Sequence, residues 1–141
     1  MVNRQRLARL DANRIARLGD ATLAAVGKKG CSLTIAFVRD RTIRDLNRKF
    51  RASDRATDVL SFPRVNPGDE DFPEAGVDYL GDILVSADTA LRQANETGLP
   101  LEREVDELVI HGVLHLCGYD HENDRGEMNR LELKLRRRLL D

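Results

Sequence analysis

The sequence has few cysteines and aromatic residues, and it lacks a long apolar run. Its 141 residues include two cysteines, Cys31 and Cys117, too few for a disulfide-stapled secreted scaffold. Aromatic residues make up 4% and tryptophan is absent, which argues against an extended platform for stacking bases. No apolar stretch approaches the roughly 20 residues that cross a bilayer, and none of signal-peptide length follows Met1. We therefore expect a cytoplasmic protein with no membrane partner.

Neither sign of charge dominates. Lysine and arginine total 23 and aspartate and glutamate total 24, for a net charge of −1. This balance excludes a uniformly basic nucleic-acid coat protein, although a local basic patch remains compatible with it. The length is that of one domain, so we expect residues 1–141 to form a single domain.

Apolar spacing and turn residues predict helices and strands that alternate loosely. Helices are expected over residues 4–26, 40–50, 86–96, 101–117 and from about 124 onward, and strands over 31–38, 58–62 and 79–85. Asp40 is expected to cap the second of these helices. Residues 63–78, rich in proline and acidic side chains, are expected to form an exposed loop. Together these elements predict an α+β domain with a small mixed β-sheet covered by helices.

All three histidines of the chain lie within eleven residues. His111 and His115 are four apart in the predicted helix over 101–117, which places both rings on one face. Two imidazole nitrogens so placed can reach one divalent ion at about 2.0–2.1 Å. Gly118 ends the helix, so the chain can turn and bring His121 in as a third ligand. The alternative is that these histidines are ordinary core or surface residues of a helix.

Three neutral nitrogen donors suit one zinc ion (Zn²⁺) best, with nickel, cobalt or copper as chemical substitutes. Structural zinc sites are usually closed by four protein ligands, whereas catalytic sites leave a position open. Cys117 lies about 120° around the helix from His111, so we expect it to pack in the core. Asp120 can either ligate the metal or orient an imidazole. The pattern therefore favours a catalytic metal site on a central zinc-binding helix.

The histidine pair is similar to the His-Glu-x-x-His helix of zinc peptidases, with one difference. Gly112 stands where those enzymes carry the glutamate that acts as general base. This weakens a peptidase interpretation. Glycine costs about 1 kcal/mol in a helix interior relative to alanine, so either a strand or a substrate is expected to approach the backbone at Gly112.

The segment from His111 to His121, His-Gly-x-Leu-His-Leu-x-Gly-Tyr-Asp-His, resembles the signature of the YbeY family of bacterial endoribonucleases. The stretch from Arg51 to Thr-Asp-Val-Leu-Ser-Phe-Pro, ending at Pro63, and the Leu-Gly-Asp-Ile segment over residues 80–83 resemble two further family segments. The resemblance runs from about Cys31 to the final helix.

The resemblance implies a single metal-dependent endoribonuclease domain that acts on single-stranded RNA. It implies a role in 16S ribosomal RNA 3′-end maturation, ribosomal RNA processing and ribosome quality control, with the ribosome or its proteins as partners and no DNA substrate. The zinc ligands it implies are His111, His115 and His121. The catalytic residues it implies are Arg51, His111 and His115.

The residue chemistry is compatible with phosphodiester cleavage. Arg51 belongs to a stretch of sequence with six basic and two acidic side chains, which gives a local net charge of +4. The six are Arg41, Arg44, Arg48, Lys49, Arg51 and Arg55. Such a patch suits a single-stranded polyanion, although a solvated helix face is the simpler explanation for Arg41, Arg44 and Lys49. Arg51 is expected to begin a loop, where functional side chains are often presented.

Two points stay open at the sequence level. Proton removal can fall to a metal-activated water, to a carboxylate such as Asp120 or to a 2′-hydroxyl of the substrate. Asp82 can support a histidine or bond a backbone amide. The competing functions are a non-catalytic ribosome-assembly factor with a structural zinc site and a metal-dependent hydrolase of a small molecule or peptide.

Overall fold

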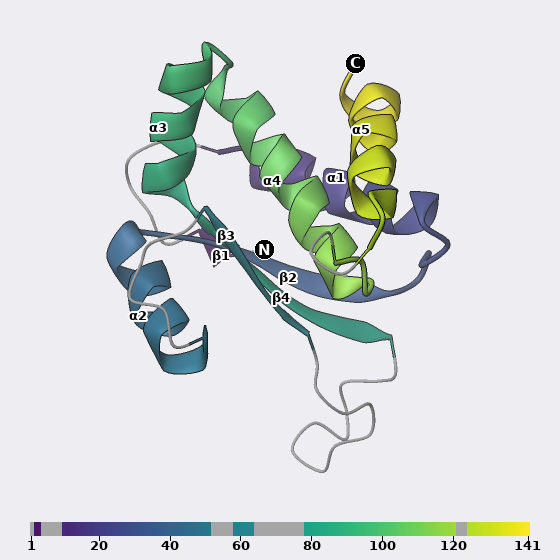
Figure 1. Ribbon diagram of the computed structural model, residues 1–141, viewed down its shortest axis with the longest axis horizontal. Helices are drawn as coiled ribbons and strands as arrows, with labels where there is room; N and C mark the ends of the chain where they lie inside the picture. The colour runs from purple at the N-terminus through teal and green to yellow at the C-terminus, as the bar shows by residue number, and fades with distance from the viewer. Residues whose placement is uncertain (1, 4–9, 52–57, 64–77, 121–123) are drawn as a thin grey trace.

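The structure is a computed structural model that describes residues 2–3, 10–51, 58–63, 78–120 and 124–141. For Val2, Asn3, Phe50 and Arg51 it describes the backbone only. The elements in chain order are β1 (Val2–Asn3), α1 (Ala12–Ala25), β2 (Ser32–Val38), α2 (Asp40–Arg51), β3 (Val59–Pro63), β4 (Tyr79–Ser86), α3 (Ala87–Thr97), α4 (Leu101–Leu116) and α5 (Glu127–Leu140) (Figure 1).

The sheet is mixed, as the sequence predicts. Its strand order is β1-β2-β4-β3. The pairs β1–β2 and β2–β4 are parallel, whereas β3 joins β4 in the antiparallel direction at the edge of the sheet. In this last pair Ser61 lies opposite Ile83. Both residues approach Gly112 of the helix that carries His111 and His115.

Helices cover both faces of the sheet because side chains alternate along each strand. Phe37 and Ile83 belong to the larger core with side chains of α1, α3, α4 and α5. Their neighbours Val38 and Leu84 belong to a smaller cluster with Ile43 of α2. The predicted α+β architecture, a small mixed sheet covered by helices, is therefore confirmed.

Helix α4 is the central element of the larger core. It packs against α1, α3, α5, β3 and β4, and Figure 1 shows it running between α3 and α5. Nine of its residues are buried, a pattern expected for a helix surrounded on most sides. They are Val105, Asp106, Leu108, Val109, Ile110, Gly112, Val113, Leu114 and Leu116. His111 and His115 are thus carried by a helix that packs against five other elements.

Two local features differ from the sequence-based expectation. Helix α1 begins at Ala12 with Asp11 as its cap, and residues 4–9 of the predicted helix lie outside the described residues. Asp40 is the first residue of α2 rather than its cap. Its carboxylate accepts hydrogen bonds from Ser86 and from Thr89 (2.7 Å), so it ties α2 to the start of α3. Local sequence could not reveal this tertiary role.

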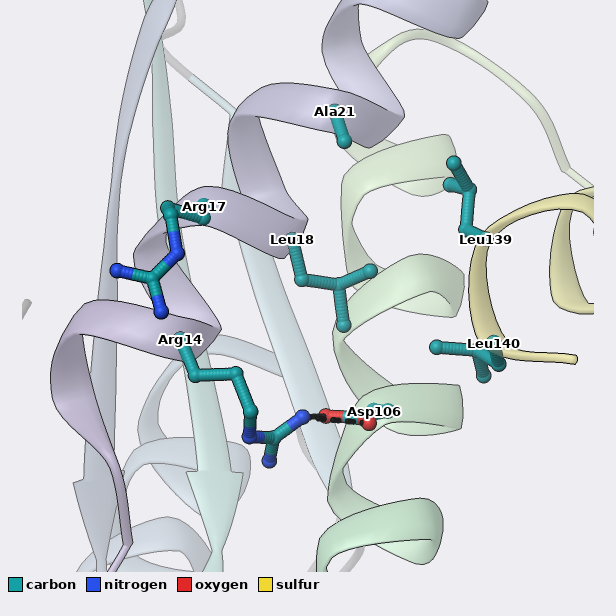
Figure 2. A pocket seen from close by; sticks show the side chains of 7 residues that line it. All are labelled: Arg14, Arg17, Leu18, Ala21, Asp106, Leu139 and Leu140. Atoms are coloured by element: carbon teal, nitrogen blue, oxygen red, sulfur yellow. Dashed lines mark hydrogen bonds and ion pairs between the residues drawn. The ribbon is translucent and has the colours of Figure 1, made fainter.

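An ion pair joins α1 to α4. Nη1 of Arg14 lies 2.7 Å from each of the two carboxylate oxygens of Asp106. The Asp106 side chain is nine-tenths buried. Figure 2 shows this pair at the wall of a pocket of about 380 Å³ between α1, α4 and α5. The other lining residues are Arg17, Leu18, Ala21, Leu139 and Leu140. Neither His111 nor His115 lines this pocket.

None of the described helices is long and apolar enough to cross a lipid bilayer.

Candidate metal centre

The structure brings His111 and His115 together on one face of α4, as their spacing predicts. Their ring centroids are 4.6 Å apart and the ring planes are inclined by 74°. The Nε2 atoms of the two rings lie 3.0 Å apart. Two ring nitrogens therefore converge on one point at the partly exposed side of a largely buried helix.

A third side chain approaches this pair from α5. The Oε1 atom of Glu132 lies 2.7 Å from Nδ1 of His111, and the Glu132 residue is 7% exposed. Burial alone would raise the pKa of this carboxyl, but the hydrogen bond with His111 and the nearby charge of Arg136 outweigh it and lower the pKa below its usual value. The carboxylate of Glu132 is therefore held beside Nδ1 of His111, the ring nitrogen that faces away from His115.

Sequence reasoning missed Glu132, although the sequence carries a signal for it. Glu132 follows buried Met128 by four residues and precedes buried Leu135 by three, so it falls on the apolar stripe of α5. A carboxylate on such a stripe needs a polar partner to compensate for its burial. Which partner it finds depends on how α5 packs against α4.

Gly112, between the two histidines, faces the sheet. A Cβ atom built at Gly112 would lie 2.8 Å from Cγ2 of Ile83 on β4, closer than carbon atoms pack. The carbonyl oxygen of Gly112 accepts a hydrogen bond of 3.2 Å from Ser61 Oγ on β3. Of the two expected reasons for this glycine, the close approach of a strand is the one observed.

Asp82 supports neither a histidine nor a backbone amide through the bonds that the structure describes. Its carboxylate accepts a hydrogen bond from the hydroxyl of Tyr79. That hydroxyl also lies 2.8 Å from Oγ1 of Thr34. This cluster is on the sheet and is partly exposed. Burial raises the pKa of the Tyr79 hydroxyl, and the hydrogen bond to Asp82 raises it further.

Cys117 is half-buried and packs against the larger core, as expected. Burial raises the pKa of its thiol, which disfavours the thiolate that a metal would need. Asp120 is also half-buried.

Several predicted site residues cannot be placed. His121 lies outside the described residues, as do Arg55 and residues 64–77 of the acidic loop. The backbone of Arg51 is described and ends α2, so this residue closes a helix instead of opening a loop; its side chain lies outside the described part. Among the described residues no group of three His, Cys, Asp or Glu side chains is arranged to hold a metal ion.

The donor chemistry of the described pair nevertheless fits a divalent ion such as zinc. An imidazole that donates its Nδ1 hydrogen to a carboxylate offers a lone pair at Nε2. Two nitrogens 3.0 Å apart must be bridged by a proton or a cation, since two facing lone pairs repel each other. His111 and His115 can therefore offer two ring nitrogens to such an ion.

Comparisons with known proteins agree with this architecture. A family model described as Endoribonuclease YbeY matches residues 2–140. A protein named Endoribonuclease YbeY from Anaeromyxobacter dehalogenans is 48% identical over 79% of this chain, and the chain spans 54% of that relative's length. A relative of the same name from Geobacter sulfurreducens is 36% identical over 96% of this chain and 89% of its own length.

A solved structure is also similar. The solution structure of TM1509 from Thermotoga maritima has 27% sequence identity and a TM-score of 0.56, with 95% of this chain and 84% of that chain covered. The family resemblance and the nuclease class that it implies are confirmed, since the matching relatives are named endoribonucleases. On the match over residues 2–140 and these relatives, the chain belongs to the endoribonuclease YbeY family.

Proposed function

We propose that this chain is a zinc-dependent endoribonuclease that cuts single-stranded RNA in the cytoplasm. Its proposed substrate is ribosomal RNA, in 16S 3′-end maturation, ribosomal RNA processing and ribosome quality control, and its proposed partners are the ribosome or ribosomal proteins. The family match supports the reaction class. The proposal treats residues 1–141 as a single metal-dependent endoribonuclease domain.

One observation carries the metal-dependent part of this proposal. The Nε2 atoms of His111 and His115 converge to 3.0 Å, while Glu132 holds the other nitrogen of His111. A carboxylate behind a histidine is the usual arrangement at metal-binding imidazoles, because it fixes the ring and its tautomer. Ordinary surface histidines on a helix have no need of a buried carboxylate partner.

The residues proposed to hold zinc are His111, His115 and His121. A zinc ion held by three nitrogens lowers the pKa of a water molecule and polarises a phosphoryl oxygen. Arg51 is proposed to hold the scissile phosphate bidentately, so that its guanidinium balances the charge that grows on the phosphoryl oxygens. The packing of α4 against five other elements holds the backbone that carries His111 and His115.

The basic face of α2 supports a polyanionic substrate. Arg41, Arg48 and Lys49 are exposed. Nη2 of Arg48 lies 3.3 Å from Oδ1 of Asp45, and both of these side chains are about half exposed to solvent. Because released counterions drive such binding, RNA affinity should fall as salt is added.

The test compares the wild type with His115→Ala, purified in parallel, in cleavage of an end-labelled single-stranded RNA. Zinc content is measured on the same samples. Cleavage by the wild type alone, with zinc lost from the variant, is the expected result, and it excludes a contaminating ribonuclease. Equal cleavage by both would overturn the assigned site. Zinc in the wild type without cleavage by either protein would favour the ribosome-assembly factor with a structural zinc site.

A further inference from the structure

Glu132 is a buried acidic residue on the face of α5 that otherwise carries buried apolar side chains. The residue is 7% exposed and lies on the same side of α5 as Met128 and Leu135. Glutamate is almost never so deeply buried unless it is paired. Its described partners are His111 on α4 and Arg136 one turn later on α5.

The carboxylate of Glu132 lies against one of the two ring nitrogens of His111. A carboxylate oxygen accepts hydrogen bonds, and a guanidinium can only donate them. The Oε2 atom of Glu132 lies 3.5 Å from Nη2 of Arg136, while Oε1 lies 2.7 Å from Nδ1 of His111. A neutral His111 that donates to this carboxylate from Nδ1 keeps its lone pair at Nε2, the nitrogen that faces His115.

Arg136 is itself held from a second side. Its Nη1 atom lies 3.1 Å from Oε1 of Glu107 on α4. Glu107 also accepts a hydrogen bond of 2.9 Å from Nε of Arg103. Arg136 thus lies between Glu107 on α4 and Glu132 on α5, within ion-pair distance of both carboxylates.

We propose that Glu132 is a positioning residue that holds His111 in the tautomer whose Nε2 lone pair faces the metal site, with Arg136 as the anchor of its carboxylate. The proposal rests on the proposed metal-dependent function and adds to it a role for a residue 21 positions beyond His111. Glu132 does not ligate the metal in this arrangement, because His111 stands between them. Its effect on zinc is exerted through the orientation of the ring.

The test begins with the chelator-treated protein, so that it does not depend on metal. Nitrogen-15 NMR at alkaline pH reports which ring nitrogen of His111 carries hydrogen in the wild type, in Glu132→Leu and in Glu132→Gln. We expect hydrogen on Nδ1 in the wild type and a shift to the Nε2–H form, which histidine prefers in water, in the leucine variant. Glutamine keeps an oxygen acceptor and should preserve the wild-type form in large part.

The matched control is Asp106→Leu. Asp106 is also 7% exposed, lies on α4 and is ion-paired, with Arg14, but it contacts neither histidine. A merely structural role for Glu132 predicts the same consequences from both leucine variants. The positioning role predicts that both lower the melting temperature while only Glu132→Leu changes the tautomer of His111.

Zinc titration by calorimetry provides the second readout. Loss of the partner that orients a metal-binding histidine typically weakens metal affinity 10–100-fold. We expect a loss of about that size for Glu132→Leu, a smaller loss for Glu132→Gln and none beyond about twofold for Asp106→Leu. An unchanged tautomer in Glu132→Leu would overturn the proposal even if zinc binds. If the wild type binds no zinc, the metal-dependent function fails, while the tautomer result still decides the role of Glu132.

Discussion

Gly112 on α4 and Ile83 on β4 are in such close contact that a Cβ at Gly112 would lie 2.8 Å from Cγ2 of Ile83. Ile83 is fully buried, so its side chain has little space into which to move. The missing side chain lets the helix with the two histidines lie directly on the sheet. The height of the two histidines above the sheet therefore depends on this glycine.

The substitution Gly112→Ala is expected to destabilise the protein. Overpacking of a core typically costs 1–3 kcal/mol, and the gain in helix propensity returns only about 1 kcal/mol. We expect a net loss of up to about 2 kcal/mol in the free energy of unfolding, measured by urea denaturation.

Gly19→Ala is the matched control for this prediction. Gly19 is a buried glycine inside α1, and its added Cβ would meet Ile35 Cδ1 at 3.4 Å, an ordinary contact. The helix propensity of alanine should leave this variant as stable as the wild type or more stable by up to about 1 kcal/mol. Equal destabilisation of both variants would show that the contact with Ile83 is not the cause.

The link between α2 and α3 through Asp40 predicts a pH-dependent stability. Burial by itself would raise the pKa of Asp40, but hydrogen bonds from Ser86, Thr89 and Arg92 together lower it below the ordinary 3.8. Because the folded-state pKa is the lower one, the stabilisation is complete above about pH 4 and is lost as the pH falls through the folded-state value. Asp40→Asn should therefore lose about 1 kcal/mol at neutral pH, and the difference from the wild type should shrink below pH 4.

Urea denaturation of both proteins across this pH range checks the prediction. Asp45→Asn is the control, since Asp45 pairs with Arg48 at 3.3 Å across two exposed side chains. Exposed ion pairs contribute little to folding stability. The free energy of unfolding of Asp45→Asn should therefore differ from that of the wild type by less than about 0.5 kcal/mol at every pH. A pH-independent loss in Asp40→Asn would mean that its charge is not what links the helices.

Arg51 is predicted to act on the substrate and not on the metal. Arg51→Ala should reduce kcat/KM for RNA cleavage by a factor of about 10²–10³, the usual effect of losing one charge-stabilising donor. Its zinc content should equal that of the wild type. Arg51→Lys should restore only part of the activity, because an ammonium group cannot bind a phosphate bidentately. Loss of zinc in Arg51→Ala would contradict this division of roles.

Zinc is predicted to stabilise the folded chain. A ligand present at 100 times its dissociation constant adds about 2.7 kcal/mol to the stability of the folded state. Removal of zinc by a chelator should therefore lower Tm by several degrees in the wild type, as measured by calorimetry. His115→Ala should have the Tm of the chelated wild type whether or not the chelator is present. An identical response of the variant and the wild type would place the metal elsewhere.

The fold was largely predictable because its main signals are local. The apolar positions of α4 and the alternation along β2 and β4 identify a buried helix and half-buried strands without knowledge of their partners. The strand Val2–Asn3 was missed, since two residues carry no periodicity. The role of Asp40 was misjudged because its hydrogen-bond partners lie 46 or more residues away along the chain.

The candidate site likewise has one contact that local sequence predicts and one that depends on tertiary packing. The spacing of His111 and His115 is set by helix geometry, so the sequence alone predicts that the two rings meet. The contact between His111 and Glu132 spans 21 residues and a change of direction. It depends on how α5 packs on α4, which the apolar pattern of α5 leaves undetermined.

A zinc titration followed by RNA cleavage tests the metal-dependent activity most directly. Chelator-treated protein receives zinc in steps, and the rate of cleavage of an end-labelled single-stranded RNA is measured at each step for the wild type and His111→Ala. We predict a rate that rises from the chelated baseline and levels off at one zinc per chain in the wild type, and no rise in the variant. Cleavage by the chelated wild type at its full rate, or an equal rise in His111→Ala, would contradict catalysis at this metal centre.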